Sequence, residues 1–404
     1  MTRDRSSLTP GLLAALGFVS AVGPFATDMY LASFTDIAQD LGTVASSVQL
    51  TLTAFLIGIG TGQLVLGPLS DRWGRRPVLL SALAVFALSG AATVFSPTIG
   101  VFIALRFVQG FSGAAGVVVA RAIAADLSRG ADTVRALSLI ATVVGLGPLL
   151  APPIGGLVAT VWGWRGVLAV LAAVSVAMLL VAALVIPESL RRSQRHAGGL
   201  GSTFRTLGGL LGDGGLTAYV LAFALAFATM MSYIAASPFV GQSVLGMSPL
   251  VYSLGFAAGA AALLLANLAN ARLAPRFGAR RMLFVGTTLL VAASAALTAL
   301  VVFDVLAPWS FIACAFAVTA GTGFTMSNAS ALALARSGHA RGSGSALLGA
   351  SQFLLGGLVS PLVGLWGEHT ALPMAITMTV AAAAAWALAR VAGAAGPFLP
   401  RAAP

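Results

Sequence analysis

Long apolar runs separated by short polar segments dominate this chain of 404 residues. A helix needs about 20 mostly apolar residues to cross the roughly 30 Å hydrocarbon layer of a membrane. Twelve runs are long enough, and none shows the ten-residue alternation of a membrane β-strand. We therefore predict an all-α integral membrane protein with spans at 11–34, 47–69, 77–95, 98–120, 135–160, 165–186, 216–239, 249–270, 281–301, 306–334, 343–366 and 370–393.

The composition supports a membrane protein. Hydrophobic residues make up 58% of the chain and charged residues 8%, whereas a soluble surface needs roughly a quarter to a third of its residues charged. The single cysteine, Cys314, excludes an intrachain disulfide and a cysteine metal site. The first apolar run is too long for a signal-peptide core, so we expect it to be retained as a span.

The placement of the arginines predicts the orientation. All 22 basic residues are arginines, and they gather between the apolar runs without the interleaved aromatics of a nucleic-acid surface. If the amino terminus is inside, twenty of the 22 fall on the cytoplasmic side, with Arg165 outside and Arg106 within a span. The positive-inside rule then predicts that both termini are cytoplasmic in the inner membrane, and no nucleic-acid partner.

The sequence indicates that the chain is an internal duplication of one six-span unit. Its longest charged segment, 187–215, separates six spans in 1–186 from six in 216–404. GPLSDRWGRR at 67–76 matches ARLAPRFGAR at 271–280, a shift of 204 residues. Duplicated halves are the usual plan of secondary transporters, whose binding site lies between the halves near mid-membrane.

The segment Gly67–Arg76 resembles motif A of the major facilitator superfamily, and the wider chain resembles its Bcr/CflA drug-resistance transporters from about residue 11 to 390. This resemblance implies a major facilitator fold of two six-helix bundles and a proton-coupled antiporter that exports small amphipathic drugs. It implies a monomer powered by the proton gradient without another cofactor. The segments that carry it are TDMYLASF at 27–34, the run at 48–80, ALRFVQGFSGAAG at 104–116, YIAASPFV at 233–240, NARLAPRFGARR at 270–281 and SGSALLGASQFLLG at 343–356.

Two charges within spans are the candidates for proton coupling. A charged Asp28 in the first span costs roughly 2.5–3.5 kcal/mol on insertion scales, and a carboxylate that changes protonation in a cavity is what coupling requires. The alternative is a hydrated aspartate near the outer end of the span. Arg106 opens the sequence Arg-x-x-Gln-Gly, which resembles motif B. We expect it to drive proton release from Asp28, the alternative being a structural arginine held by backbone carbonyls.

Two further motifs are candidates for conformational control. The motif A residues are Gly67, Asp71, Arg72, Gly74, Arg75 and Arg76. By resemblance, Asp71 joins an ion-pair latch between the bundles, although charges there would orient the chain in any case. The second set resembles the exporter-associated motif C, with Ala151 in place of its central glycine: Gly147, Pro148, Pro152, Gly155 and Gly156.

The substrate cavity has only candidate residues. They are polar, aromatic or adaptable side chains on different spans, and ordinary helix packing explains each equally well. Flexible and aromatic groups suit promiscuous binding of amphipathic compounds. The candidates are Tyr30, Gln109, Met230, Tyr233, Asn328 and Gln352.

Other classes of function fit less well. The chain has no lysine for a Walker A site and no His-Glu-x-x-His motif, so we expect neither an enzyme, nor a metal site, nor an ATP-driven pump. A dedicated exporter of one metabolite, such as a nucleoside, a sugar or a secondary product, would share these motifs and remains the main alternative. A passive channel and a receptor are less consistent with duplicated halves.

Overall fold

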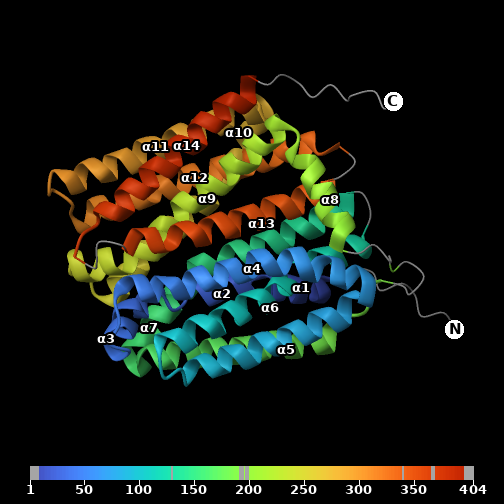
Figure 1. Cartoon of the computed structure of the whole chain (residues 1–404), viewed down its shortest axis with the longest axis horizontal. Coiled ribbons are helices and arrows are strands. Elements are labelled where there is room, and N and C mark those ends of the chain that lie inside the picture. The colour runs from blue at the N-terminus through green and yellow to red at the C-terminus, as the bar shows by residue number, and fades with distance from the viewer. Residues whose placement is uncertain are drawn as a thin grey trace.

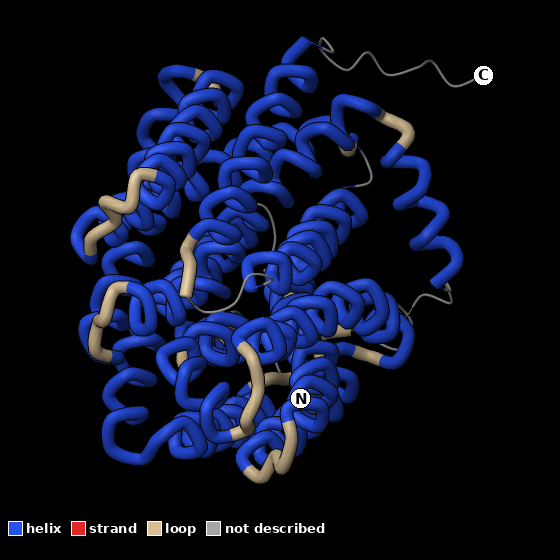
Figure 2. The backbone as a smooth tube through the Cα atoms, turned by 60° about the vertical axis from the view of Figure 1, so that its left-hand side comes forward, coloured by secondary structure: helices blue, strands red, loops and turns tan. Residues whose placement is uncertain are grey.

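The structure is a computed structural model, and it describes residues 9–128, 131–190, 195, 200–338, 341–364 and 369–394. The arginines at positions 3, 5, 129, 191, 192 and 401, which contribute to the predicted orientation, lie outside the described residues. Figure 2 shows helices joined by short loops, without a strand in the described part of the chain.

Most of the helices are long and roughly antiparallel to their neighbours in sequence (Figure 1). In the first half they are α1 (Pro10–Ser20), α2 (Val22–Asp28), η1 (Leu31–Ser33), α3 (Phe34–Asp40), α4 (Ala45–Trp73), α5 (Arg75–Val94), α6 (Ile99–Asp126) and α7 (Ala131–Val185). In the second half they are α8 (Leu200–Leu211), α9 (Gly214–Phe239), η3 (Val240–Val244), α10 (Pro249–Phe277), α11 (Ala279–Val302), α12 (Pro308–Arg336), α13 (Arg341–Val359), η5 (Ser360–Gly364) and α14 (Leu372–Ala394).

The predicted count of twelve crossings is confirmed once α7 is divided. Eleven apolar stretches are long enough to span a membrane among the described residues, and one of them, Arg135–Val185, has 51 residues. At 1.5 Å per residue a straight helix of that length would be roughly twice as long as a membrane is thick. Gly163 interrupts it with a φ of 65°, a left-handed conformation that glycine adopts without strain. The chain turns there, so α7 supplies two crossings.

The first crossing differs most from its predicted bounds of 11–34. It extends over Pro10–Asp40 and is broken into α1, α2, η1 and α3. Asp28 is the last residue of α2, and Met29 and Tyr30 separate it from η1. Because the crossing ends at Asp40, Asp28 lies about 18 Å from that end at 1.5 Å per residue. It is therefore deeper in the membrane than the predicted bounds of 11–34 implied.

The internal repeat is visible in the helix bounds. α10 begins and ends 204 positions after α4, at 249 against 45 and at 277 against 73. Gly74 and Gly278 follow these helices with φ values of 106° and 84°, and each is followed at once by the next helix. The same left-handed turn therefore occurs at the same place in both halves.

The linker contains a helix that the sequence interpretation did not predict. α8 (Leu200–Leu211) lies at the end of the molecule where α1 begins and α14 ends, hereafter the termini end, and it contacts α13, α9 and α4 (Figure 1). Leu207 on this helix is buried. The division into 1–186, 187–215 and 216–404 stays a prediction, since much of the linker lies outside the described residues.

The two halves share a buried apolar core toward one end of the molecule. At the end opposite the termini, one apolar cluster combines side chains of both halves, among them Phe34 of α3 and Phe239 of α9, whose rings lie 6.0 Å apart. Gln49 donates a hydrogen bond to the carbonyl of Ala235 there, and Gln242 donates one to the carbonyl of Ala32. Toward the termini end, the first and second halves have separate apolar clusters. The structure is thus closed between the halves at the end opposite the termini.

A half-buried ion pair joins α9 to α12 at the termini end. Asp213 caps α9 by accepting from the amides of Gly215 and Leu216, and it pairs with Arg336 at 3.2 Å. Partial burial raises the pKa of the Asp213 carboxyl, but Arg336 and the two amides lower it more, so the net pKa lies below its ordinary value. A carboxyl with a lowered folded pKa stabilises the protein above its unfolded pKa, and this contribution is lost as the pH falls through the folded pKa.

Asp213→Ala should therefore lower the free energy of unfolding at pH 7 by roughly 2 kcal/mol, about 1 for the cap and about 1 for the pair. The difference from wild type should shrink below about pH 4, where the unfolded carboxyl is protonated. Thermal unfolding in detergent at pH 7 and pH 3.5 measures both effects. Asp213→Asn is the matched control because it keeps the capping acceptor and should lose about half as much. A difference that does not change with pH would contradict the ion-pair contribution.

Candidate functional site

Asp28 is buried inside the protein. It is 4% exposed to solvent, and the hydroxyl of Thr27 donates to its Oδ1 atom at 2.7 Å. It lies at the break between α2 and η1. Broken membrane helices near the midplane are where secondary transporters place ion and substrate sites, because the interrupted backbone leaves polar groups available. This favours a functional aspartate over a hydrated one near the outer end.

Arg106 on α6 is fully buried against the same crossing. Its Nη2 atom donates to the carbonyl of Ala26 at 2.7 Å, and its Nη1 atom donates to Gln109 Oε1 at 2.6 Å. The guanidinium also lies over the rings of Tyr30 and Phe55, at 4.5 and 4.2 Å from their centroids. Aromatic faces and carbonyl oxygens offset the cost of burying this cation. The arginine thus fixes the helix on both sides of Asp28, at Ala26 and at Tyr30.

Asp28 and Arg106 form no described ion pair, although Arg106 contacts Ala26 and Tyr30, two residues before and two residues after Asp28. No described ion pair within 4.0 Å or hydrogen bond joins them, and the Nε atom of Arg106 has no hydrogen-bond partner among the described residues. The contact to Ala26 matches the alternative of an arginine held by a backbone carbonyl. That the charge of Arg106 acts on the Asp28 carboxylate stays a prediction.

Aromatic residues of the second half face this region. Tyr233 on α9 stacks against Phe256 at a centroid distance of 5.9 Å, and the hydroxyl of Tyr252 on α10 lies 2.9 Å from Ser237 Oγ. Both tyrosines belong to the same buried apolar cluster as Met29 and Tyr30, which follow Asp28 in the chain. Tyr233 was predicted as a cavity candidate, whereas Tyr252 was not. That Tyr252 is one of only four tyrosines, and lies within a predicted span, was the signal that could have found it.

The glycine pair of the motif C segment touches both halves. A Cβ atom on Gly155 would overlap the backbone carbonyl of Met29, next to Asp28, and one on Gly156 would overlap Ser253 Oγ on α10. Gly147 likewise lies against Pro24. The first part of α7 is thereby wedged between the first crossing and α10. Small residues at membrane helix contacts permit such close approach.

The motif A segment forms an ion-pair cluster within the first half. Arg75 pairs with Asp71 at 2.6 Å and with Asp126 of α6 at 3.0 Å, and its amide donates to Glu188 at 3.0 Å. The Nη2 atom of Arg76 donates to the carbonyl of Ala183. The described partner of Asp71 is thus four residues away in its own half. A latch between the halves stays a prediction for a conformation in which the termini end is closed.

The remaining residues predicted to line the substrate cavity lie in different parts of the structure. Asn328 on α12 is buried and donates to Asn270 Oδ1 at 2.6 Å, a partner that the sequence interpretation missed. Tyr30 and Gln109 belong to the Arg106 cluster. Met230 is half-buried against the core shared by the halves, and Gln352 is half-buried on α13. Whether these residues touch substrate stays a prediction.

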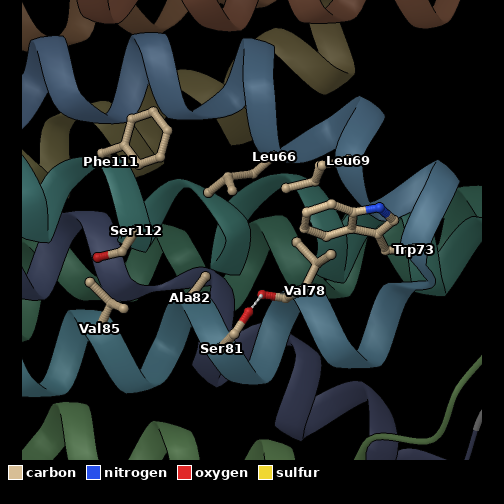
Figure 3. Close-up of a pocket in the computed structure, with 9 residues that line it drawn as sticks. All are labelled: Leu66, Leu69, Trp73, Val78, Ser81, Ala82, Val85, Phe111 and Ser112. Carbon is tan, nitrogen blue, oxygen red and sulfur yellow. Dashed lines mark hydrogen bonds between the residues drawn. The ribbon is translucent and has the colours of Figure 1, made fainter. Parts of the chain in front are cut away.

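An apolar crevice of 220 Å³ lies between α4, α5 and α6, within the first half (Figure 3). Leu66, Leu69, Trp73 and Phe111 are among the side chains that line it. Its two hydroxyls are already used, since Ser81 and Ser112 donate to carbonyls of their own helices. The crevice therefore offers a ligand apolar contact without directional recognition, and it lies apart from Asp28.

Two bundles of six crossings, a shared core at one end and a buried charge at a broken helix define a secondary membrane transporter. The model of the Major Facilitator Superfamily matches residues 16–361. The chain belongs to the major facilitator superfamily.

Known proteins of this class resemble the chain over most of its length. An uncharacterized MFS-type transporter, YdgK, from Bacillus subtilis (strain 168) is 36% identical over 91% of each chain. A bicyclomycin resistance protein homolog from Haemophilus influenzae is 32% identical over 91% of this chain and 92% of its own. The fold matches that of a bacterial homolog of the human lysosomal transporter Spinster in an inward-facing, unoccupied conformation, with a TM-score of 0.73, 15% identity, and coverage of 97% of this chain and 99% of that one.

Proposed function

We propose that the protein is a proton-driven antiporter that exports small amphipathic drugs or antibiotics across the bacterial cytoplasmic membrane. The observation that carries this proposal is Asp28, the one buried carboxylate among the described residues, at the break in the first crossing, where Arg106 holds the carbonyl of Ala26. The similarity to a bicyclomycin resistance protein homolog supports the drug class.

We propose that the termini end faces the cytoplasm. The arginine-rich turns after α4 and α10 lie at this end, and the positive-inside rule assigns them to the cytoplasmic face. Arg165, the one arginine expected outside, lies at the opposite end and pairs there with Asp40. In this orientation the structure is closed toward the outside.

The proposed cycle exchanges one proton for one substrate. A proton from outside binds the Asp28 carboxylate, and the positive potential of Arg106 then favours its release toward the cytoplasm. Each proton that enters supplies about 2.3 kcal/mol per 100 mV of membrane potential, in addition to any pH difference. Aromatic faces at Tyr30, Tyr233 and Tyr252 would contact an amphipathic substrate.

The face between α4 and α13 is suited to movement of one half against the other. Gly349, Gly357 and Gly364 on the α13–η5 segment lie against Gln63, Ile57 and Gln49 of α4. Buried polar atoms of Gln49, Thr53 and Gln63 lack a partner among the described residues. A helix contact that is lined by glycines and leaves polar atoms unpaired costs little free energy to separate. Alternating access requires such a separation of the halves.

Accumulation of ethidium, chloramphenicol and bicyclomycin in cells tests the proposal. Cells that express the protein should accumulate less of at least one compound than empty-vector cells, and an uncoupler should remove the difference. Unchanged accumulation across these and a wider panel would contradict drug export. It would favour the alternative, a dedicated exporter of one metabolite, which counterflow of labelled nucleosides and sugars would then identify.

A further inference from the structure

A basic cavity lies on the outer flank of the second half, at the termini end. It has a volume of 840 Å³ and is formed by the end of α10, the start of α11 and the end of α14. Three arginines line it, Arg280 and Arg281 from α11 and Arg390 from α14, and none of its described lining residues is acidic. This cavity plays no part in the transport cycle proposed above.

Its position is at the lipid, not at the interface between the halves. α11 packs on α10, α12 and α14, and α14 packs on α9 and α11, so both belong to the flank away from the first half (Figure 1). Phe284 and Val285 on the cavity wall are 40% and 49% exposed, and Val391 on α14 is 62% exposed. Apolar side chains with this exposure in a membrane protein contact acyl chains.

Aromatic and cationic side chains meet at the cavity rim. The guanidinium of Arg390 lies 4.2 Å from the ring centroid of Trp386 and 4.9 Å from that of Phe284. The indole of Trp386 donates to Thr288 Oγ1 at 3.2 Å. Tryptophan rings gather at the depth of lipid headgroups. The stacking also holds Arg390 at the rim, where it loses little further freedom on meeting a phosphate.

We propose that this cavity binds the headgroup of an anionic phospholipid from the cytoplasmic leaflet, with the phosphate against Arg281 and Arg390 and an acyl chain along Phe284 and Val285. Arginine recognises phosphate through planar, paired donors. Basic pockets between membrane helices on the cytoplasmic side suit phosphate-bearing lipid headgroups. The site is independent of the exported substrate and of proton coupling, and only its assignment to the cytoplasmic leaflet rests on the orientation given with the proposed function.

Native mass spectrometry of the purified protein tests the site directly. The protein is equilibrated with defined mixtures of phosphatidylglycerol, cardiolipin, phosphatidylethanolamine and phosphatidylcholine, and the bound lipid is counted. Wild type should retain phosphatidylglycerol or cardiolipin in preference to the other two. An arginine at the membrane surface is worth about fivefold in affinity for anionic lipid, so R281Q/R390Q should bind about 25-fold more weakly.

Matched variants distinguish lipid binding in the cavity from a general effect of the protein's net charge. R272Q/R276Q removes two arginines from the same end of the molecule, outside the cavity, and should retain lipid as wild type does. R281K/R390K keeps the charge and should recover part of the binding, which excludes misfolding as the cause of the loss. Equal lipid retention by wild type and R281Q/R390Q would overturn the proposal, as would an equal loss in R272Q/R276Q. Full displacement of the lipid by inorganic phosphate at low millimolar concentration would also overturn it, in favour of a free-phosphate site.

Discussion

Asp28→Asn is expected to abolish uphill export while exchange of substrate across the membrane continues. Asparagine preserves the size of the side chain and can still accept from the Thr27 hydroxyl, but it cannot take up or release a proton. For an uncharged substrate such as chloramphenicol, the charge of one proton at 100 mV is worth about 2.3 kcal/mol, which sustains a substrate gradient of about 50-fold. The variant should lose this gradient entirely.

Transport assays in vesicles that contain the purified protein distinguish a loss of proton coupling from a loss of substrate binding. An imposed pH gradient should drive ethidium accumulation with wild type and none with Asp28→Asn, whereas counterflow of labelled substrate should persist in both. Asp36→Asn is the control, since Asp36 belongs to the same crossing but is exposed on α3. Gradient-driven transport by Asp28→Asn would show that another group carries the proton.

The fold was predictable because its signals are local. Apolar run length and arginine placement each act within about 20 residues, and together they gave all twelve crossings, including the two joined at Gly163. The repeat between the segments at Gly74 and Gly278 was likewise readable, since a left-handed turn demands glycine in both copies. The break at Asp28 was not predicted, because the apolar run continues through it.

The contacts between the halves could not be read from the sequence. Gln49 meets Ala235, and Gly156 meets Ser253, across sequence separations that no local pattern encodes. Single buried charges were identifiable, since a lone aspartate or arginine in an apolar run is costly and therefore noticeable. Neutral partners such as Tyr252 and Asn270 cost less in a span than a charge does, and they gave a weaker signal.

Gly155→Ala, which adds a single methyl group, is expected to have the second largest effect on transport, after Asp28→Asn. A Cβ atom there would overlap the Met29 backbone, which cannot rotate away as a side chain can, so the first crossing must move relative to α7. Overpacking of this kind typically costs 1–3 kcal/mol. Because Met29 adjoins Asp28, we expect Gly155→Ala to lower the transport rate by at least about tenfold.

A series along α7 provides the controls. Gly156→Ala should have a smaller effect, since its Cβ would meet the Ser253 side chain, which can rotate, and Gly145→Ala should be neutral because nothing lies within 4 Å of its Cβ position. In a Cys314→Ser background, Ser253→Cys reports separation of α7 from α10 through its labelling by an impermeant maleimide added outside. Gly155→Ala should increase that labelling, because a displaced α7 no longer closes the end opposite the termini. Wild-type transport and labelling in Gly155→Ala would mean that the contact with Met29 is not needed for closure, and that the glycine pair serves helix packing alone.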